Sequence, residues 1–447
     1  MTHSVSDERL QIRNARKNFI AMAATYFCSV FNDNFFKQSV LLLAVSAGRN
    51  DAQGLATMIF TLPYLIVTAP AGWLADRFSK RNVVICVKVL ELIAMIIGAL
   101  GMLLLKPGDS LSSFSWLLIL TMLALMGIHA SLFSPSLNGS IPELYPESYV
   151  TQANGIVKLV CTLAILCGIA LAGFALDSQS TSAIITWFQH IFPAPVGQCV
   201  VALTVLSVAV FGLLVSFGVP KRKAAGTRDS FPWFGPVNTV RDLLKIREDS
   251  LLHISVWANT FFWFMGSLMV LIINEMGPMQ FNLNKTSTSV LVVAEMLGVG
   301  VGALLAARFA KGEKWYRVLL PTLFMMTLFL LLMSCIIYMP SFKFREFSFQ
   351  VMVLFLLLVL FGVCSGLYLI PLESFIQIRP SADQKGKVIA ASNFAALMGV
   401  FVAGPLYWIL AKLNLKPTQS FMVLAGISGL YGWKLFLSLK RAGLTHK

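Results

Sequence analysis

The stretch Gly72-Trp73-Leu74-Ala75-Asp76-Arg77-Phe78-Ser79-Lys80-Arg81 lies between two apolar runs, 53–75 and 82–105. A membrane-spanning helix needs about 20 mainly apolar residues, and both runs are long enough. The charged residues of this stretch end one run and precede the next. The sequence therefore predicts two spanning helices joined by a short polar loop.

The same alternation of apolar runs and short charged segments continues along the chain. Of the 447 residues, 57% are hydrophobic and only 12% are charged, whereas soluble domains carry roughly 25% charged residues. This composition excludes disordered, collagen-like and disulfide-scaffold chains. We predict an all-α integral membrane protein with twelve transmembrane helices. The predicted spans are 18–47, 53–75, 82–105, 114–141, 151–176, 197–219, 251–276, 287–309, 316–339, 349–378, 387–411 and 418–438.

Basic residues predict the topology. The chain has 35 Lys and Arg against 20 Asp and Glu, a net charge of +15. The bases sit in short bursts between apolar runs, which argues against nucleic acid as a partner. In membrane proteins most Lys and Arg lie in cytoplasmic segments. The chain follows this rule if both of its termini are cytoplasmic. We predict a multi-pass protein of the bacterial inner (plasma) membrane.

The first span is not a cleavable signal peptide, because it is too long and carries Asp33 and Lys37 in its middle. No Walker loop, nucleophile motif or metal cluster is present, so we predict no enzyme, metal or cofactor. The seven Cys show no CxxC spacing and indicate reduced packing residues.

A long polar linker divides the spans six and six. We predict an N-terminal six-helix bundle over 1–219, a cytoplasmic linker over 220–250 and a C-terminal six-helix bundle over 251–447. Within the linker, Lys221-Arg222-Lys223 is basic. Val237, Val240, Leu244 and Arg247 have the spacing of an interfacial helix. A plain solvated linker is the alternative.

The two halves resemble each other. Ala75-Asp76-Arg77-Phe78-Ser79-Lys80 follows the second span, and Ala306-Ala307-Arg308-Phe309-Ala310-Lys311 follows the eighth. Two six-helix halves of like topology predict two pseudo-symmetric bundles, as in a duplicated transporter with its site between them.

These features together resemble the major facilitator superfamily, whose signature after the second helix is G-x-L-a-D-r-x-g-r-[KR]. The chain is most similar to its lysophospholipid transporter branch, including the transporter halves of fused acyltransferases. Three regions carry this resemblance. They are Phe31-Asn32-Asp33-Asn34-Phe35-Phe36-Lys37-Gln38; Ser134-Pro135 with Ile141-Pro142-Glu143 and Ala153-Asn154-Gly155; and Pro371-Leu372 with Gln377 and Gly386-Lys387-Val388-Ile389-Ala390-Ala391-Ser392-Asn393-Phe394.

The chain departs from the branch at two positions. Leu137 replaces a Lys of the fourth helix, and Glu373 replaces an Asn after Pro-Leu. If the Lys of this branch helps to bind a phosphate head group, another cation must take that role in this chain. Lys158 in the fifth span is the best remaining cation for a phosphate, or else a partner of Asp33 or Glu91.

Ionisable residues inside spans are costly and usually face a cavity or pair with one another. Asp33 could bind an ammonium, a cation or a proton, or simply pair with Lys37. His129 suits a proton-linked step or an interhelical hydrogen bond. Lys88 and Glu91 form an i,i+3 pair, in which we expect Lys88 to reach the cytoplasmic surface. The predicted substrate-binding or coupling residues are Asp33, Lys37, His129, Lys158, Glu295, Glu373 and Asn393.

The resemblance implies that the motif after the second helix acts in gating, through Gly72, Asp76, Arg77 and Arg81. It also implies a twelve-helix secondary transporter working by alternating access. Its substrate would be a lysophospholipid, moved toward the cytoplasmic leaflet.

We expect membrane lipids, a small amphiphilic substrate and a separate acyltransferase as partners, and a monomeric chain. A proton-coupled exporter of drugs, siderophores or other amphiphiles is the alternative. A membrane scaffold without transport is a third possibility, against which the charges inside the spans argue.

Overall fold

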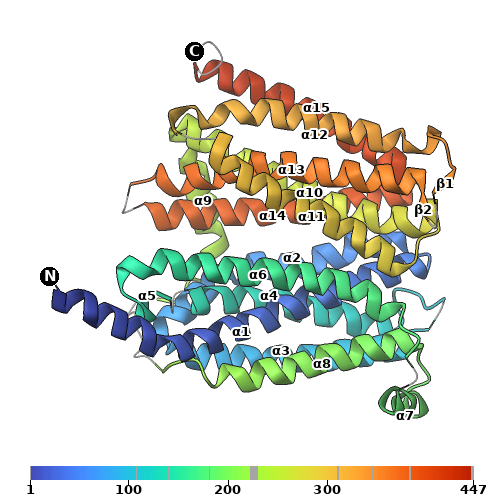
Figure 1. Cartoon of the computed structure of the whole chain (residues 1–447), viewed down its shortest axis with the longest axis horizontal. Coiled ribbons are helices and arrows are strands. Elements are labelled where there is room, and N and C mark those ends of the chain that lie inside the picture. Colours follow the sequence, from blue (N-terminus) through green and yellow to red (C-terminus); the bar gives the residue numbers. More distant parts are fainter. Residues whose placement is uncertain are drawn as a thin grey trace. The chain divides into compact units, whose positions relative to one another are not determined.

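The computed structural model (Figure 1) describes residues 2–106, 108–138, 141–180, 182–221, 230–309, 312–344, 347–381 and 384–443. Arg222, Lys223 and Lys311 of the predicted basic segments lie outside these ranges. So does the side chain of Leu137, although its backbone belongs to a helix.

The described chain is almost entirely helical. The helices of the first half are α1 (Thr2–Ser46), α2 (Asn50–Arg77), α3 (Lys80–Leu104), α4 (Phe114–Asn138), α5 (Ile141–Leu144), α6 (Glu147–Leu176), α7 (Ala183–Ile191) and α8 (Val196–Ser216). The linker forms α9 (Gly235–Lys245) and η1 (Ile246–Glu248). The second half has α10 (Ser250–Phe281), α11 (Lys285–Phe309), η2 (Gly312–Val318), α12 (Leu319–Ser334), η3 (Ile336–Tyr338), α13 (Phe349–Ile378), α14 (Lys385–Lys412) and α15 (Pro417–Arg441).

Each predicted span coincides with a helix. Eleven of the described helices are long and apolar enough to cross a membrane. The twelfth predicted span, 18–47, lies in α1, where Asn32, Asp33, Asn34 and Lys37 lower the hydropathy. The chain is a multi-pass membrane protein with a twelve-helix, two-bundle fold, as the sequence predicted.

Several short helices and strands that connect the spans were not predicted from the sequence. A short helix, α7, precedes α8 (Figure 1), and its N-cap Ser182 accepts a hydrogen bond from the Ile185 amide. The predicted span 316–339 is regular only over α12, because 3-10 turns flank it. Two short antiparallel strands, β1 (Lys343–Phe344) and β2 (Phe347–Ser348), join η3 to α13.

The chain packs into two compact units. The first comprises residues 1–43 and 59–236, and the second comprises 44–58 and 237–447. The end of α1 and the start of α2 therefore pack with the second unit, although they belong to the first sequence half. The predicted boundaries at 219/220 and 250/251 follow the spans and stay a prediction.

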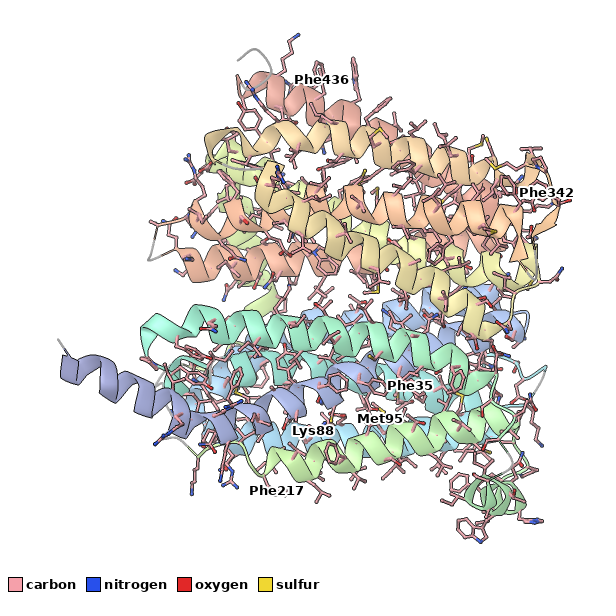
Figure 2. All side chains as sticks on the ribbon, viewed as in Figure 1. Phe35, Lys88, Met95, Phe217, Phe342 and Phe436 are labelled. Atoms are coloured by element: carbon pink, nitrogen blue, oxygen red, sulfur yellow. The ribbon has the colours of Figure 1, made fainter. Side chains whose placement is uncertain are left out.

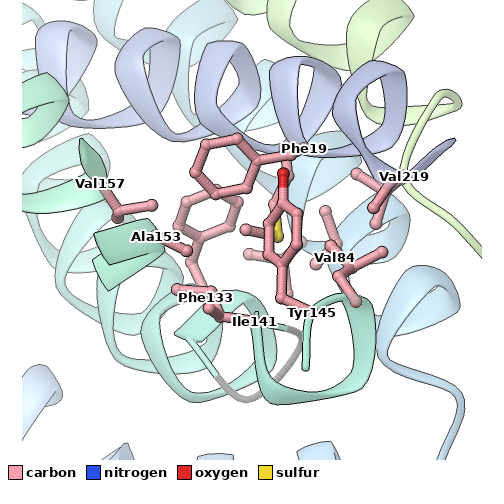
Figure 3. Packing of buried hydrophobic residues seen from close by; sticks show 12 residues of the cluster. Phe19, Val84, Phe133, Ile141, Tyr145, Ala153, Val157 and Val219 are labelled. Atoms are coloured by element: carbon pink, nitrogen blue, oxygen red, sulfur yellow. The ribbon is translucent and has the colours of Figure 1, made fainter. Parts of the chain in front are cut away.

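One end of the first unit is closed by an apolar cluster (Figure 3). Phe19 of α1 meets Tyr145 edge-on, with ring centroids 5.3 Å apart, and Tyr26 meets Phe133 at 5.6 Å. Ile141 of α5 is fully buried beneath these rings. Aromatic pairs of this geometry add to the burial of their area, so the cluster fixes α1 against α4 and α5.

In the second unit, α11 and α13 cross closely through glycines. A Cβ atom added to Gly298 or Gly302 would collide with carbonyl oxygens of α13, whereas one added to Gly300 would meet open space. Small residues let helix backbones approach in membranes. Gly298 and Gly302 therefore allow the close crossing, whereas Gly300 takes no part in it.

Candidate functional site

The polar face of α1 is built by helical spacing. Ser29, Asp33 and Lys37 recur four residues apart, and Asn32 lies three residues after Ser29, which places all four on one side of the helix. Ser29 and Asn32 are fully buried, and Asp33 and Lys37 are partly buried. This face packs inside the first unit, so its polar groups need partners there.

Glu91 of α3 is the centre of the buried network. Its carboxylate pairs with the Lys88 ammonium one turn earlier. It accepts hydrogen bonds from Ser29 Oγ at 2.8 Å and from Asn32 Nδ2 at 3.2 Å. The Nε2 atom of His129 lies 3.0 Å from Glu91 Oε2. We call Ser29, Asn32, Asp33, Lys88, Glu91 and His129 the α1–α3–α4 cluster.

Lys88 is entirely buried, and Figure 2 shows it among the side chains inside the first unit. Its Nζ atom also donates to Ser29 Oγ at 3.1 Å. A Cβ atom added to Gly212 of α8 would lie 2.6 Å from this Nζ, so the glycine leaves room for the ammonium. The expectation that Lys88 reaches the membrane surface is therefore wrong, because Glu91 and Ser29 hold it inside.

His129 of α4 lies between two carboxylates. One is Glu91, and the other is Asp33, whose Oδ1 atom lies 3.9 Å from His129 Nδ1. The imidazole also stacks on Phe133 with centroids 5.4 Å apart. An imidazole between two acids can hold or pass a proton, and it can equally serve as a fixed interhelical contact.

Asp33 and Lys37 form no ion pair with each other. The Lys37 ammonium instead lies over the ring of Phe60 in α2, 5.1 Å from its centroid. The Asp33 side chain keeps 15% of its surface exposed. The two residues therefore make no direct ion pair, although their charges still interact across one helical turn.

The other predicted site residues are dispersed. Lys158 is exposed on α6 and pairs with neither Asp33 nor Glu91. Asn393 is exposed on α14, and Glu373 is partly buried on α13. Glu295 is only 5% exposed, and no described group hydrogen-bonds its carboxylate. Its backbone lies against Gly362 of α13, and its role in substrate binding or coupling stays a prediction.

The predicted gating residues lie at the end of α2 and the start of α3. Asp76 and Arg77 are exposed, and Asp76 forms no ion pair with another described residue. Arg81 donates from Nη2 to the Phe217 carbonyl at 2.9 Å, where α8 ends. A cation there complements the helix dipole. The gating role of Gly72, Asp76, Arg77 and Arg81 stays a prediction.

A second buried network, in the second unit, was not predicted. Glu275 of α10 accepts hydrogen bonds from Asn50 Nδ2 at 2.7 Å and from the Tyr407 hydroxyl at 2.8 Å. Gln53 Nε2 donates to the same hydroxyl at 2.7 Å. An ion pair between Lys412 and Asp51, at 2.8 Å, lies beside it. The only signal in the sequence was an acid at the end of the apolar run 251–276.

Comparison with known proteins identifies the family of this chain. The sequence profile of the Major Facilitator Superfamily matches residues 22–405. The chain belongs to this superfamily. It is a membrane transporter and not an enzyme, and among the described residues no group of His, Cys, Asp and Glu could hold a metal ion.

Relatives and solved structures agree with this assignment. Lysophospholipid transporters LplT of Yersinia pestis (strain Pestoides F) and Yersinia pseudotuberculosis serotype O:3 (strain YPIII) are each 24% identical over 404 residues, covering 89% of this chain and 88% of theirs. A bacterial homologue of the human lysosomal transporter Spinster, inward-facing and unoccupied, matches with a TM-score of 0.71 at 14% identity, over 95% of this chain and 97% of that one. A D-xylose–proton symporter matches at 0.67 and 14% identity, over 93% and 97%. At this identity the structures support the fold alone.

Proposed function

We propose that this transporter moves lysophospholipids across the bacterial inner membrane toward the cytoplasmic leaflet, by alternating access. Relatives named lysophospholipid transporters align over 89% of the chain, which supports this substrate class. In the first unit, the residues that support the proposal belong to the stretch 31–38, on which the resemblance to this branch also rests.

The observation that carries the proposal is the pair of separated charges on α1. Asp33 keeps an exposed edge, and Lys37 has no carboxylate partner. Residues one turn apart have Cβ atoms about 6 Å apart. This spacing suits a zwitterionic head group, whose ammonium meets Asp33 and whose phosphate meets Lys37. A charged group entering an apolar interior needs such counter-charges.

The test compares two lysolipids that differ in their head groups. In proteoliposomes, Asp33→Asn is expected to lower uptake of lysophosphatidylethanolamine at least tenfold and to spare lysophosphatidylglycerol, which has no ammonium. Lys37→Gln is expected to lower uptake of both, because both carry the phosphate. Glu248→Gln and Lys385→Gln, at exposed positions, serve as charge-matched controls.

Lys158 is the competing cation for the phosphate. If Lys158→Ala abolishes uptake of both lysolipids while Lys37→Gln does not, the phosphate contact lies on α6. If the protein in its natural sequence prefers a cationic amphiphile to either lysolipid, the proposed substrate class is wrong.

Proton-coupled export of amphiphiles is the second candidate, favoured by the placement of His129 between Asp33 and Glu91. A proton-coupled exporter would stop transporting when the proton gradient is collapsed. His129→Gln should then uncouple transport from the gradient. Lysolipid uptake that is indifferent to the gradient would exclude this candidate.

Delivery to the cytoplasmic leaflet also implies a consumer of the product. We propose that a separate acyltransferase reacylates the delivered lysophospholipid, and that the transporter itself is a monomer. Accumulation of radiolabelled diacyl phospholipid in cells that express both proteins, and not in cells with the transporter alone, would support it.

A further inference from the structure

The second unit contains a cavity of about 720 Å³ between α9, α10, α14 and α15. This volume lies in the range of about 300–1,000 Å³ typical of small-molecule sites. The lining residues are aliphatic and aromatic apart from Thr260 and Lys434, and nearly all of the lining surface is apolar. The α1–α3–α4 cluster contributes nothing to it, and neither does the Glu275 network.

The cavity has a polar end and an apolar end. Phe261 of α10 stacks on Tyr431 of α15, with ring centroids 3.9 Å apart, which sets these two residues at one level. Lys434 and Trp257 lie on one side of that level, next to α9. Phe264 and Ile427 lie on the other side. A molecule that fills the cavity therefore has hydrocarbon along its length and the exposed Lys434 at one end.

Its length fits one leaflet of a membrane. From Trp257 to Phe264 the helix rises about 10 Å, which is less than the roughly 15 Å of half a hydrocarbon core. Helix α9 covers the polar end, and its Val237 and Leu244 are 56% and 53% exposed. Exposed apolar residues on an amphipathic helix are typical of the membrane interface. The polar end thus belongs at the membrane surface.

The charge at the polar end is uncompensated. Lys434 is exposed and forms no ion pair with a described acidic side chain. His253 of α10 interacts with the charges of both Lys434 and Arg247, and it adds no negative charge. The acid of α9, Asp242, pairs with Lys245 at 3.8 Å. An anionic head group would complement the ammonium, and a cationic one would be repelled.

We propose that this cavity binds one acyl chain of an anionic phospholipid of the surrounding bilayer, with the lipid phosphate on Lys434. The lipid lies head outward along α15, and its chain follows Phe261 toward Phe264. The site is separate from the transported substrate, so the inference does not rest on the proposed function.

Native mass spectrometry of the purified full chain tests the site, with phosphatidylglycerol and phosphatidylcholine as probes. The unaltered chain is expected to retain one phosphatidylglycerol in preference to phosphatidylcholine. Lys434→Ala should weaken retention of phosphatidylglycerol about fivefold, the effect of one basic residue at a lipid surface. Lys440→Ala removes the same charge from α15 outside the cavity and should leave retention unchanged.

A second variant tests the apolar end. Val402 of α14 lines the cavity and is 48% exposed, so Val402→Trp can fill the space without disturbing the core. It should lower retention of both probes. Equal losses in Lys434→Ala and Lys440→Ala, or unchanged retention in Val402→Trp, would overturn the proposal. Displacement of phosphatidylglycerol by an equal concentration of lysophosphatidylethanolamine would make the cavity part of the transport path and would also overturn it.

Discussion

Glu91 has four neighbours within the first unit, and among them the Lys88 ammonium forms an ion pair with its carboxylate. Burying either charge alone is expensive, whereas burying the pair with its hydrogen bonds is tolerated. The cluster therefore behaves as a unit whose members depend on one another. We therefore expect Glu91 to contribute to stability, whereas Asp33 and Lys37 are the residues proposed to contact the substrate.

Neutralising Glu91 should destabilise the protein. In Glu91→Gln the Lys88 ammonium loses its counter-charge, and breaking a buried pair from one side costs about 3–5 kcal/mol. The midpoint of thermal unfolding in detergent should fall markedly. The double variant Lys88→Met with Glu91→Gln removes both charges and should recover most of the loss. Exposed Glu248→Gln is the control, and an unchanged midpoint in Glu91→Gln would contradict the argument.

Helix packing in the second unit depends on single glycines of α11. Gly302→Ala places a methyl group against the Val363 carbonyl oxygen of α13, so the helices must separate. Overpacking of this kind costs about 1–3 kcal/mol. The methyl group of Gly300→Ala has no atom within contact distance, so this variant should be neutral or slightly stabilising. Ala has a higher helix propensity than Gly. Equal unfolding midpoints for the two variants would show that the α11–α13 crossing adapts freely.

The start of α10 depends on a carboxylate that also reaches α13. Asp249 accepts hydrogen bonds from the Leu251 and Leu252 amides at 3.1 Å, and Arg379 Nε donates to it at 2.7 Å. Burial by itself would raise the pKa of Asp249. The hydrogen bonds from Arg379 and the amides outweigh it and hold the pKa below its ordinary value.

This contact should make stability depend on acid pH. A carboxyl group whose pKa is lowered on folding stabilises the protein above its unfolded pKa of about 3.9, and the contribution disappears as the pH falls through the folded pKa. Asp249→Asn keeps an N-cap but loses the charge. It should unfold at a lower temperature than the unaltered chain at pH 7, and the two should converge near pH 3. A constant difference would mean that the charge has no part in the effect.

The sequence predicted the twelve spans to within a few residues in most cases, because long apolar runs in a membrane protein leave few alternatives. It also identified Asp33, Lys88, Glu91 and His129 one by one. It predicted the Lys88–Glu91 pair. It could not predict that Glu91 also contacts Ser29, Asn32 and His129, because the pattern along one helix does not show which neighbouring helix each face meets. The Glu275 network was missed for the same reason, since the partners of Glu275 lie on helices far away in the sequence.

The Glu275 network joins helices from both sequence halves. The start of α2 belongs to the predicted first half, yet Asn50, Gln53 and Asp51 pack with α10 and α14. Gly54 also lies against the backbone at Gly404. Transporters of this architecture work by movement of one half against the other. A contact between segments of the two halves must then break and re-form in each cycle.

Locking this contact should stop transport. In a chain whose exposed native cysteines are replaced by Ser, Asp51→Cys with Lys412→Cys places thiols at the two positions that the 2.8 Å ion pair now joins. Because Cys is shorter than Lys, a bifunctional maleimide with a reducible disulfide in its spacer links the two thiols. Linking should abolish uptake of any substrate, and a reductant should restore it, because the ends of α2 and α14 can then separate again. Asp249→Cys with Arg379→Cys, linked in the same way, joins α10 to α13, both from the second half, and should leave uptake intact. Undiminished transport by the chain cross-linked between 51 and 412 would mean that these segments stay together throughout the cycle, and the Glu275 network would then be a fixed structural contact.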